Sequence, residues 1–143
     1  LENSNILDLF AGVGSFGLEC LSRGSAHVTF IENYINVLPV LKKNIFNIGY
    51  EKNSIIIEKN IIDNINFKNI KKKFEIIFLD PPYKENRLSA ILNNIIESNL
   101  LQKNGIIILH RHKKEEGKFP FQLNIIEEKT YGISRVFFCN YSK

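Results

Sequence analysis

Cysteine, long apolar runs and a strong charge of one sign are all scarce in this chain of 143 residues. Cys20 and Cys139 lie far apart in apolar stretches without metal-ligand spacing, which favours buried free thiols over a disulfide framework. No apolar run approaches the length that crosses a bilayer, and the first residues lack the pattern of a signal peptide. We therefore expect a cytoplasmic protein that uses neither a membrane nor a metal.

The composition indicates one globular domain with a modest basic bias. Apolar residues make up 44% of the chain and aromatic residues 11%, which suffices for one hydrophobic core over residues 1–143. The formal net charge is +4, because 19 lysine and arginine residues oppose 15 acidic ones. This excess is compatible with a nucleic-acid partner, but the codon usage of an AT-rich genome also enriches lysine. Charge alone therefore does not identify a partner.

Short apolar runs alternate with amphipathic segments, which is typical of βαβ units and a mostly parallel sheet. Strands are expected at residues 5–10, 26–32, 54–58, 74–79 and 105–109, and helices at 15–22, 34–48 and 88–98. Pro39 fits the second helix only if that helix begins just upstream, where proline's missing N–H is tolerated. Segments 121–129 and 134–139, joined at Tyr131-Gly132, predict a closing antiparallel hairpin. The expected fold class is α/β, with a twisted parallel sheet between helices and a C-terminal hairpin.

A glycine-rich turn of the form G-x-G-x-x-G follows the first predicted strand and contains Gly12, Gly14 and Gly17. Glycine permits a tight reversal and lets a ligand approach the backbone. Glu32 ends the second predicted strand, where its carboxylate can accept hydrogen bonds from both hydroxyl groups of a ribose. These features predict a nucleoside cofactor, but the glycine motif alone does not distinguish NAD, FAD and S-adenosylmethionine.

Asp8 helps to distinguish these cofactors, because it lies four residues before Gly12 at the end of the first predicted strand. A carboxylate there suits the amino group of a methionine moiety and would repel a pyrophosphate. The alternative is that Asp8 only caps the turn, which is a common role of aspartate. We predict S-adenosylmethionine as the cofactor, beside Asp8, Phe10, Ala11, Gly12 and Gly14.

The tetrapeptide Asp80-Pro81-Pro82-Tyr83 directly follows a strongly apolar predicted strand. In an open α/β sheet ligands bind at the carboxyl ends of the strands, so the tetrapeptide should face the same crevice as the glycine turn. The two prolines fix the backbone and remove two N–H donors, which leaves carbonyl oxygens beside a carboxylate and an aromatic ring. A simple surface turn is the alternative, because consecutive prolines are common in loops.

Methylation of an exocyclic amine explains this set of residues. The lone pair of such an amine is delocalised into the base, so the nitrogen is a poor nucleophile. Asp80 and the Pro81 carbonyl can accept its two N–H bonds and favour a tetrahedral nitrogen with an available lone pair. Tyr83 can stack on the base, a contact worth about 1–3 kcal/mol, which offsets much of the cost of unstacking that base. We predict Asp80, Pro81, Pro82 and Tyr83 as catalytic residues, with Asp80 also beside the cofactor.

At these residues the chain resembles the RsmD family, whose members methylate N2 of a guanine in small-subunit (16S) ribosomal RNA. The resemblance spans nearly the whole chain, including residues 7–24, 30–32 and 80–83 and the final hairpin. It implies a class I Rossmann-like methyltransferase fold, S-adenosylmethionine as methyl donor and ribosomal RNA of the small subunit as partner. It also implies that Asn60 contacts the adenine end of the cofactor and that Ile61 packs beside the ring.

Family members carry a hairpin and a helix before the first strand, and we expect this chain to lack that N-terminal extension and to act as a monomer. Basic residues around the tetrapeptide and the hairpin are candidate contacts to RNA phosphates, although solvated loops explain them equally well: Lys84, Arg87, Arg111 and Arg135. His110 and His112 have i, i+2 spacing, but no third ligand accompanies them, so we expect no metal there.

Several alternatives to a ribosomal RNA (guanine-N2)-methyltransferase stay open. A DNA adenine-N6 methyltransferase uses the same tetrapeptide chemistry, but it usually needs a target-recognition insert, for which this chain has no room. A protein-glutamine methyltransferase typically has asparagine in the place of Asp80. An NAD-dependent oxidoreductase would leave the tetrapeptide unexplained. A non-catalytic RNA-binding scaffold is less consistent with an intact set of Asp8, Glu32 and Asp80.

Overall fold

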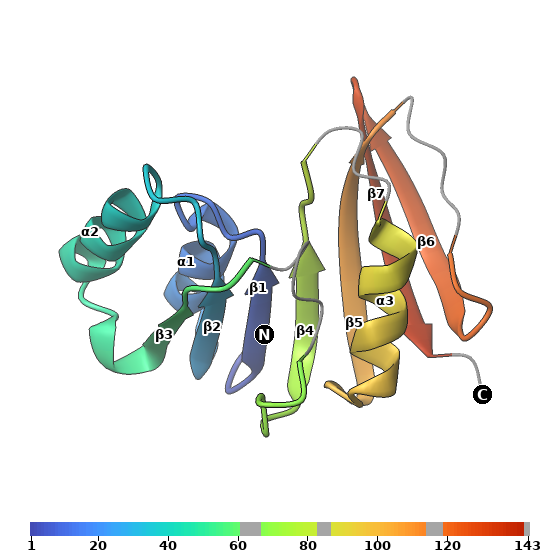
Figure 1. The fold of residues 1–143 in the computed structure, drawn as a ribbon, viewed down its shortest axis with the longest axis horizontal. Helices are drawn as coiled ribbons and strands as arrows, with labels where there is room; N and C mark the ends of the chain where they lie inside the picture. The colour runs from blue at the N-terminus through green and yellow to red at the C-terminus, as the bar shows by residue number, and fades with distance from the viewer. Residues whose placement is uncertain (61–66, 83–86, 114–118, 142–143) are drawn as a thin grey trace.

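The computed structural model describes residues 1–60, 67–82, 87–113 and 119–141, which form a seven-stranded sheet with helices on both faces (Figure 1). The strands are β1 (Asn5–Leu9), β2 (His27–Ile31), β3 (Ser54–Ile57), β4 (Phe74–Leu79), β5 (Leu101–His112), β6 (Leu123–Tyr131) and β7 (Ser134–Tyr141). Their order is β3-β2-β1-β4-β5-β7-β6. The first five strands are parallel, and β7 runs antiparallel to both β5 and β6. The predicted α/β sheet with a closing hairpin is confirmed.

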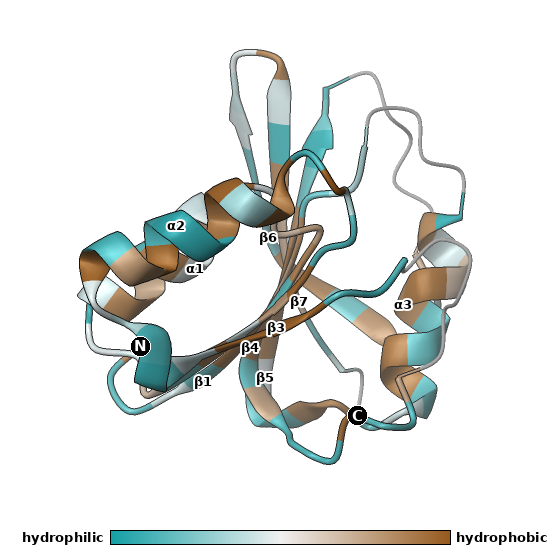
Figure 2. Ribbon diagram, turned by 60° about the vertical axis from the view of Figure 1, so that its left-hand side comes forward, coloured by the Kyte–Doolittle hydropathy of each residue, from teal (hydrophilic) through white to brown (hydrophobic). Residues whose placement is uncertain are grey.

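The helices divide between the two faces of the sheet. They are α1 (Ser15–Ser22), α2 (Leu38–Ile48) and α3 (Leu88–Glu97), with a short 3₁₀ turn η1 (Glu51–Asn53) before β3. Helices α1 and α2 lie on one side and α3 on the other, and the strands between them are mostly apolar (Figure 2). None of the described helices is long and apolar enough to cross a membrane.

Alternate residues of β1 supply two hydrophobic clusters, as the two-residue period of a strand requires. Ile6 packs with α1 and α2, whereas Leu7 and Leu9 pack on the opposite face with α3. Asp8 follows the same alternation onto the face of Ile6, and only 1% of its surface is exposed. The fold thus places one carboxylate in the core on the side of α1.

Several predicted boundaries were wrong, and β5, β6 and β7 each end later than predicted, at His112, Tyr131 and Tyr141. Helix α2 begins at Leu38 rather than at residue 34, because Pro39 is accommodated only in the first turn. Strand β5 begins at Leu101 rather than at residue 105, and an irregularity in its pairing with β4 interrupts the apolar pattern there. Strand β6 begins at Leu123 rather than at residue 121. Residues 121 and 122 form a turn, in which the Leu123 N–H donates to the Pro120 carbonyl oxygen at 3.0 Å.

Gly17 lets α1 approach β2 so closely that no side chain fits between them. A Cβ atom at position 17 would lie 2.8 Å from Phe30 Cζ and 2.9 Å from Val28 Cγ1. Gly17→Ala should lower the free energy of unfolding by about 1–3 kcal/mol, because the fully buried Phe30 ring has no room to move. Urea unfolding measures this, with the exposed Ser15→Ala in the same helix as the control. Equal stabilities of the two variants would contradict the packing argument.

Candidate functional site

The carboxyl ends of β1, β2 and β4 lie side by side at one edge of the sheet. Leu9 of β1 pairs with Ile31 of β2 on one side and with Leu79 of β4 on the other. The residues that follow these strands are therefore neighbours: the glycine turn after β1, Glu32 after β2 and Asp80 after β4. In open α/β sheets this edge is where ligands bind.

Three backbone N–H groups hold the Glu32 carboxylate. Oε1 accepts from Gly12 at 2.8 Å, and Oε2 accepts from Asn33 and Tyr34 at 3.0 Å each. A carboxylate has roughly four acceptor positions, so Glu32 keeps capacity for a further donor. The predicted position of Glu32 beside the glycine turn is thus correct, and the contact with Gly12 also fixes that turn.

The turn itself uses left-handed backbone at several positions. Gly12 has φ +59° and Gly14 has φ +91°, and a Cβ atom at Gly14 would lie 2.6 Å from Leu41 Cδ1. Phe10 also has φ +60°, which is uncommon for a residue other than glycine and typical of functional sites. Glycine explains the first two positions, whereas nothing in the sequence indicated the conformation of Phe10.

Asp8 lies beneath this turn and contacts α1. Its Oδ2 accepts a hydrogen bond from the Gly17 N–H at 3.2 Å. Burial is the main reason that the pKa of Asp8 is raised to about 7; the charges of Asp80 and Glu32 act in the same direction and the Gly17 hydrogen bond in the opposite one. The contact agrees with the capping role considered for Asp8, while a contact with a cofactor amino group stays a prediction.

Asp8→Asn should remove a pH dependence of stability. Folding raises the pKa of Asp8 from 3.8 to about 7, so between these values the folded state retains a proton that the unfolded state has lost. The wild-type free energy of unfolding should therefore fall by a few kcal/mol, in order of magnitude, as the pH rises from about 4 to about 7.

Asparagine does not titrate and keeps an acceptor for Gly17, so the stability of Asp8→Asn relative to wild type should increase over this pH range. Urea unfolding of both proteins at several pH values measures the difference. A difference that stays constant with pH would contradict the assigned burial of the charge.

Two cavities open at the edge of the sheet, and Asp80 and Pro82 line both of them. The larger has a volume of about 380 Å³, within the usual range of small-molecule sites. Its other lining residues include Phe10, Ile31, Glu32, Tyr34, Lys59 and Asn60. The smaller has a volume of about 190 Å³ and is also lined by Pro81, His110, Arg111, His112, Ile133 and Ser134. The tetrapeptide thus contributes residues to the lining of both cavities.

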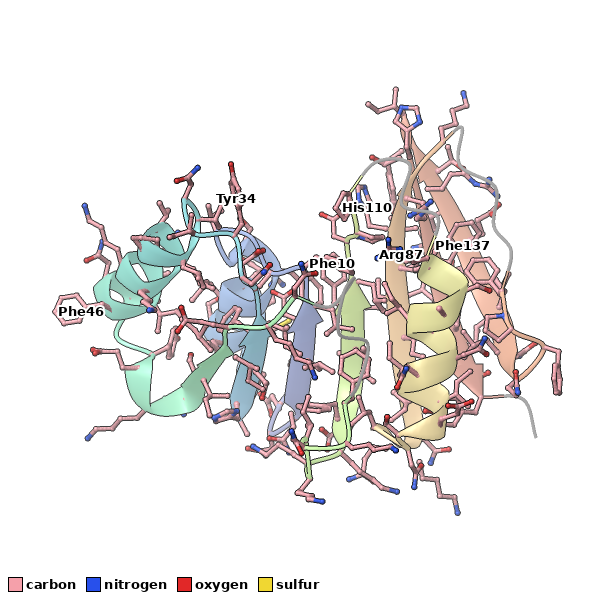
Figure 3. All side chains as sticks on the ribbon, viewed as in Figure 1. Phe10, Tyr34, Phe46, Arg87, His110 and Phe137 are labelled. Carbon is pink, nitrogen blue, oxygen red and sulfur yellow. The ribbon has the colours of Figure 1, made fainter. Side chains whose placement is uncertain are left out.

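His110 is the site residue whose role sequence reasoning missed. Its Nδ1 lies 2.8 Å from Asp80 Oδ1. The pairing of Leu79 with Leu109 brings the next residues of β4 and β5 together, so strand pairing was the signal that could have identified this contact. Figure 3 shows His110 and Phe10 at the same edge of the sheet.

The predicted RNA contacts have different environments. Arg111 is only 6% exposed and lines the smaller cavity beside Asp80, so its contact with RNA phosphates stays a prediction. Arg135 Nη2 lies 2.5 Å from Glu128 Oε1, and its guanidinium lies 4.9 Å from the centre of the Phe137 ring, so the hairpin itself engages this side chain. Arg87 is exposed just before α3. Ile61, Tyr83 and Lys84 lie outside the described residues.

The chain is similar to proteins named as methyltransferases. YlbH of Bacillus subtilis, whose name proposes rRNA methyltransferase activity, is 34% identical over 91% of this chain and 72% of YlbH. Ribosomal RNA small subunit methyltransferase D of Haemophilus influenzae is 32% identical over 93% of this chain and 69% of its own length.

Solved structures agree with this similarity. A Haemophilus influenzae protein proposed to be a methylase has a TM-score of 0.86 at 30% identity, covering 99% of this chain and 89% of its own. Structures below 25% identity, which share only the fold, include a Streptococcus mutans protein proposed to be an S-adenosylmethionine-dependent methyltransferase and another proposed methyltransferase that holds SAH. The family model described as conserved hypothetical protein 95 matches residues 1–140. The chain therefore belongs to that family, the RsmD family that its motifs resemble.

Proposed function

We propose that this protein transfers a methyl group from S-adenosylmethionine to N2 of a guanine in small-subunit ribosomal RNA. The observation that carries the proposal is that Asp80 and Pro82 line both cavities. Transfer to an amine needs a donor site and an acceptor site that meet at the groups holding the amine. The rRNA methyltransferase names of two relatives support RNA as the acceptor.

The larger cavity offers groups that fit the donor. The Glu32 carboxylate, fixed by three backbone N–H groups, would accept a hydrogen bond from the ribose. Phe10 and Ile31 supply apolar surface for the adenine, and Asn60 supplies an amide for its edge. When bound, S-adenosylmethionine supplies an electrophilic methyl group. A cationic amino group near Asp8 would favour the ionised form of this buried carboxyl.

The smaller cavity offers groups that fit a guanine. The Asp80 carboxylate would accept from the exocyclic amine, while Pro81 and Pro82 have no N–H that could compete for that oxygen. Arg111 and Ser134 supply donors in the same cavity. Guanine presents acceptors at O6 and N7, whereas adenine presents an amino group in place of O6, so donors in this wall favour guanine.

The test is transfer of labelled methyl from S-adenosylmethionine to small ribosomal subunits that lack guanine-N2 methylation. Digestion of the RNA to nucleosides should place the label in N2-methylguanosine. Parallel reactions contain free small-subunit RNA and duplex DNA. Label in N6-methyladenine of the DNA would replace the proposal with the DNA methyltransferase alternative. Absence of label from every acceptor would reject the proposal.

A further inference from the structure

We propose that His110 is a positioning residue for the reaction: its Nδ1–H holds Asp80 Oδ1, so that Oδ2 faces the amine of the acceptor base. The inference rests on the proposed function, since it assigns the part that a second residue plays in the same site. Asp80 and His110 line the same cavity, and Nδ1 and Oδ1 are 2.8 Å apart.

The two side chains differ in how firmly the backbone holds them. His110 lies within β5, between two neighbouring strands. On one side Leu109 pairs with Leu79 of β4, and on the other side His110 itself pairs with Val136 of β7. Asp80 is the first residue after β4, and its side chain is 49% exposed. The histidine is therefore the fixed partner, and the carboxylate is the group whose orientation the contact sets.

The prolines explain why Asp80 needs a distant partner. An aspartate in a turn commonly orients its carboxylate by accepting a hydrogen bond from the backbone N–H two residues later. Pro82 occupies that position and has no N–H, and Pro81 lacks one as well. His110, brought to the end of β4 by the pairing of β5, supplies a donor that Pro81 and Pro82 cannot.

The contact also determines where the imidazole carries its hydrogen. An ionised carboxylate only accepts hydrogen bonds, so His110 must donate from Nδ1. When the His110 ring is neutral, its single N–H hydrogen is therefore on Nδ1, and Nε2 carries none. This tautomer is a property of the contact and can be observed without any turnover.

The kinetic test compares His110→Ala with His110→Asn, whose side-chain amide can donate from close to the position of Nδ1. His110→Ala should lower kcat by about 10- to 100-fold, because the carboxylate loses its fixed orientation. His110→Asn should recover kcat to within about threefold of wild type, and the Kd for S-adenosylmethionine should change in neither variant. His27→Ala and His27→Asn, at the start of β2 and away from the site, are the matched controls. Wild-type kcat in His110→Ala, or equal losses in both variants, would overturn the proposal.

Nitrogen-15 NMR of the histidine rings separates this inference from the proposed function. His110 of the wild type should carry its hydrogen on Nδ1, and Asp80→Ala should shift it toward Nε2. A wild-type ring protonated on Nε2 overturns the inference whether or not the protein methylates RNA. If the predicted tautomer is found but no acceptor is methylated, the proposed function fails and the Asp80–His110 contact stands.

Discussion

Asp80→Ala should lower the rate of methyl transfer by about 10²- to 10³-fold, the usual effect of removing one preorganised polar group from a reaction centre. Asp80 lines both cavities and is the carboxylate that would hold the acceptor amine. The Kd for S-adenosylmethionine should change by less than about threefold, because the groups that fix Glu32 and the glycine turn stay in place. Single-turnover transfer and calorimetry measure the two quantities separately.

Two further variants sharpen this expectation. Asp80→Asn keeps one of the two acceptor oxygens, so it can retain either the contact with His110 or the contact with the amine. Its rate should therefore fall, but by less than that of Asp80→Ala. Glu97→Ala removes an exposed carboxylate at the end of α3 and should leave the rate unchanged. A large loss of cofactor affinity in Asp80→Ala would show that the residue serves the donor rather than the acceptor.

Glu32→Ala should produce the opposite pattern, with weaker cofactor binding as the primary defect. Loss of a hydrogen bond to a charged acceptor is expected to raise the Kd for S-adenosylmethionine by roughly 10- to 100-fold. The change also releases the N–H groups of Gly12, Asn33 and Tyr34, so the turn loses its connection to the end of β2.

Calorimetric titration of Glu32→Ala measures this Kd directly. Glu58→Ala is the matched control, because Glu58 is an exposed acid just after the neighbouring strand β3 and does not line either cavity described above. An unchanged Kd in Glu32→Ala would remove the carboxylate from the cofactor site.

Local patterns predicted much of the fold and site. The glycine turn, Glu32 and Asp80 each follow an apolar strand, and parallel strands bring their carboxyl ends to one edge. Gly12 and Gly14 both have a positive φ, a backbone conformation that favours glycine in any protein. These features depend on residues within a few positions of one another, so a single sequence contains them.

Features that depend on the exact register between distant strands were not predicted. The Asp80–His110 contact joins residues 30 positions apart and follows from the register of β4 and β5. The burial of Arg111 follows from alternation along β5, which continues past the expected end of that strand at residue 109. The polar residues His110, Arg111 and His112 concealed this continuation, because a polar run after an apolar strand is typical of a solvated loop.

Calorimetric titration of this protein with S-adenosylmethionine and, separately, with NAD tests the central claim most directly. The account predicts saturable binding of S-adenosylmethionine at one site and no binding of NAD. The Asp8 carboxyl beneath the glycine turn suits a cationic amino group, and its ionised form would repel a pyrophosphate. Binding of NAD, or no binding of S-adenosylmethionine, would contradict the assignment of the larger cavity as a methyl-donor site.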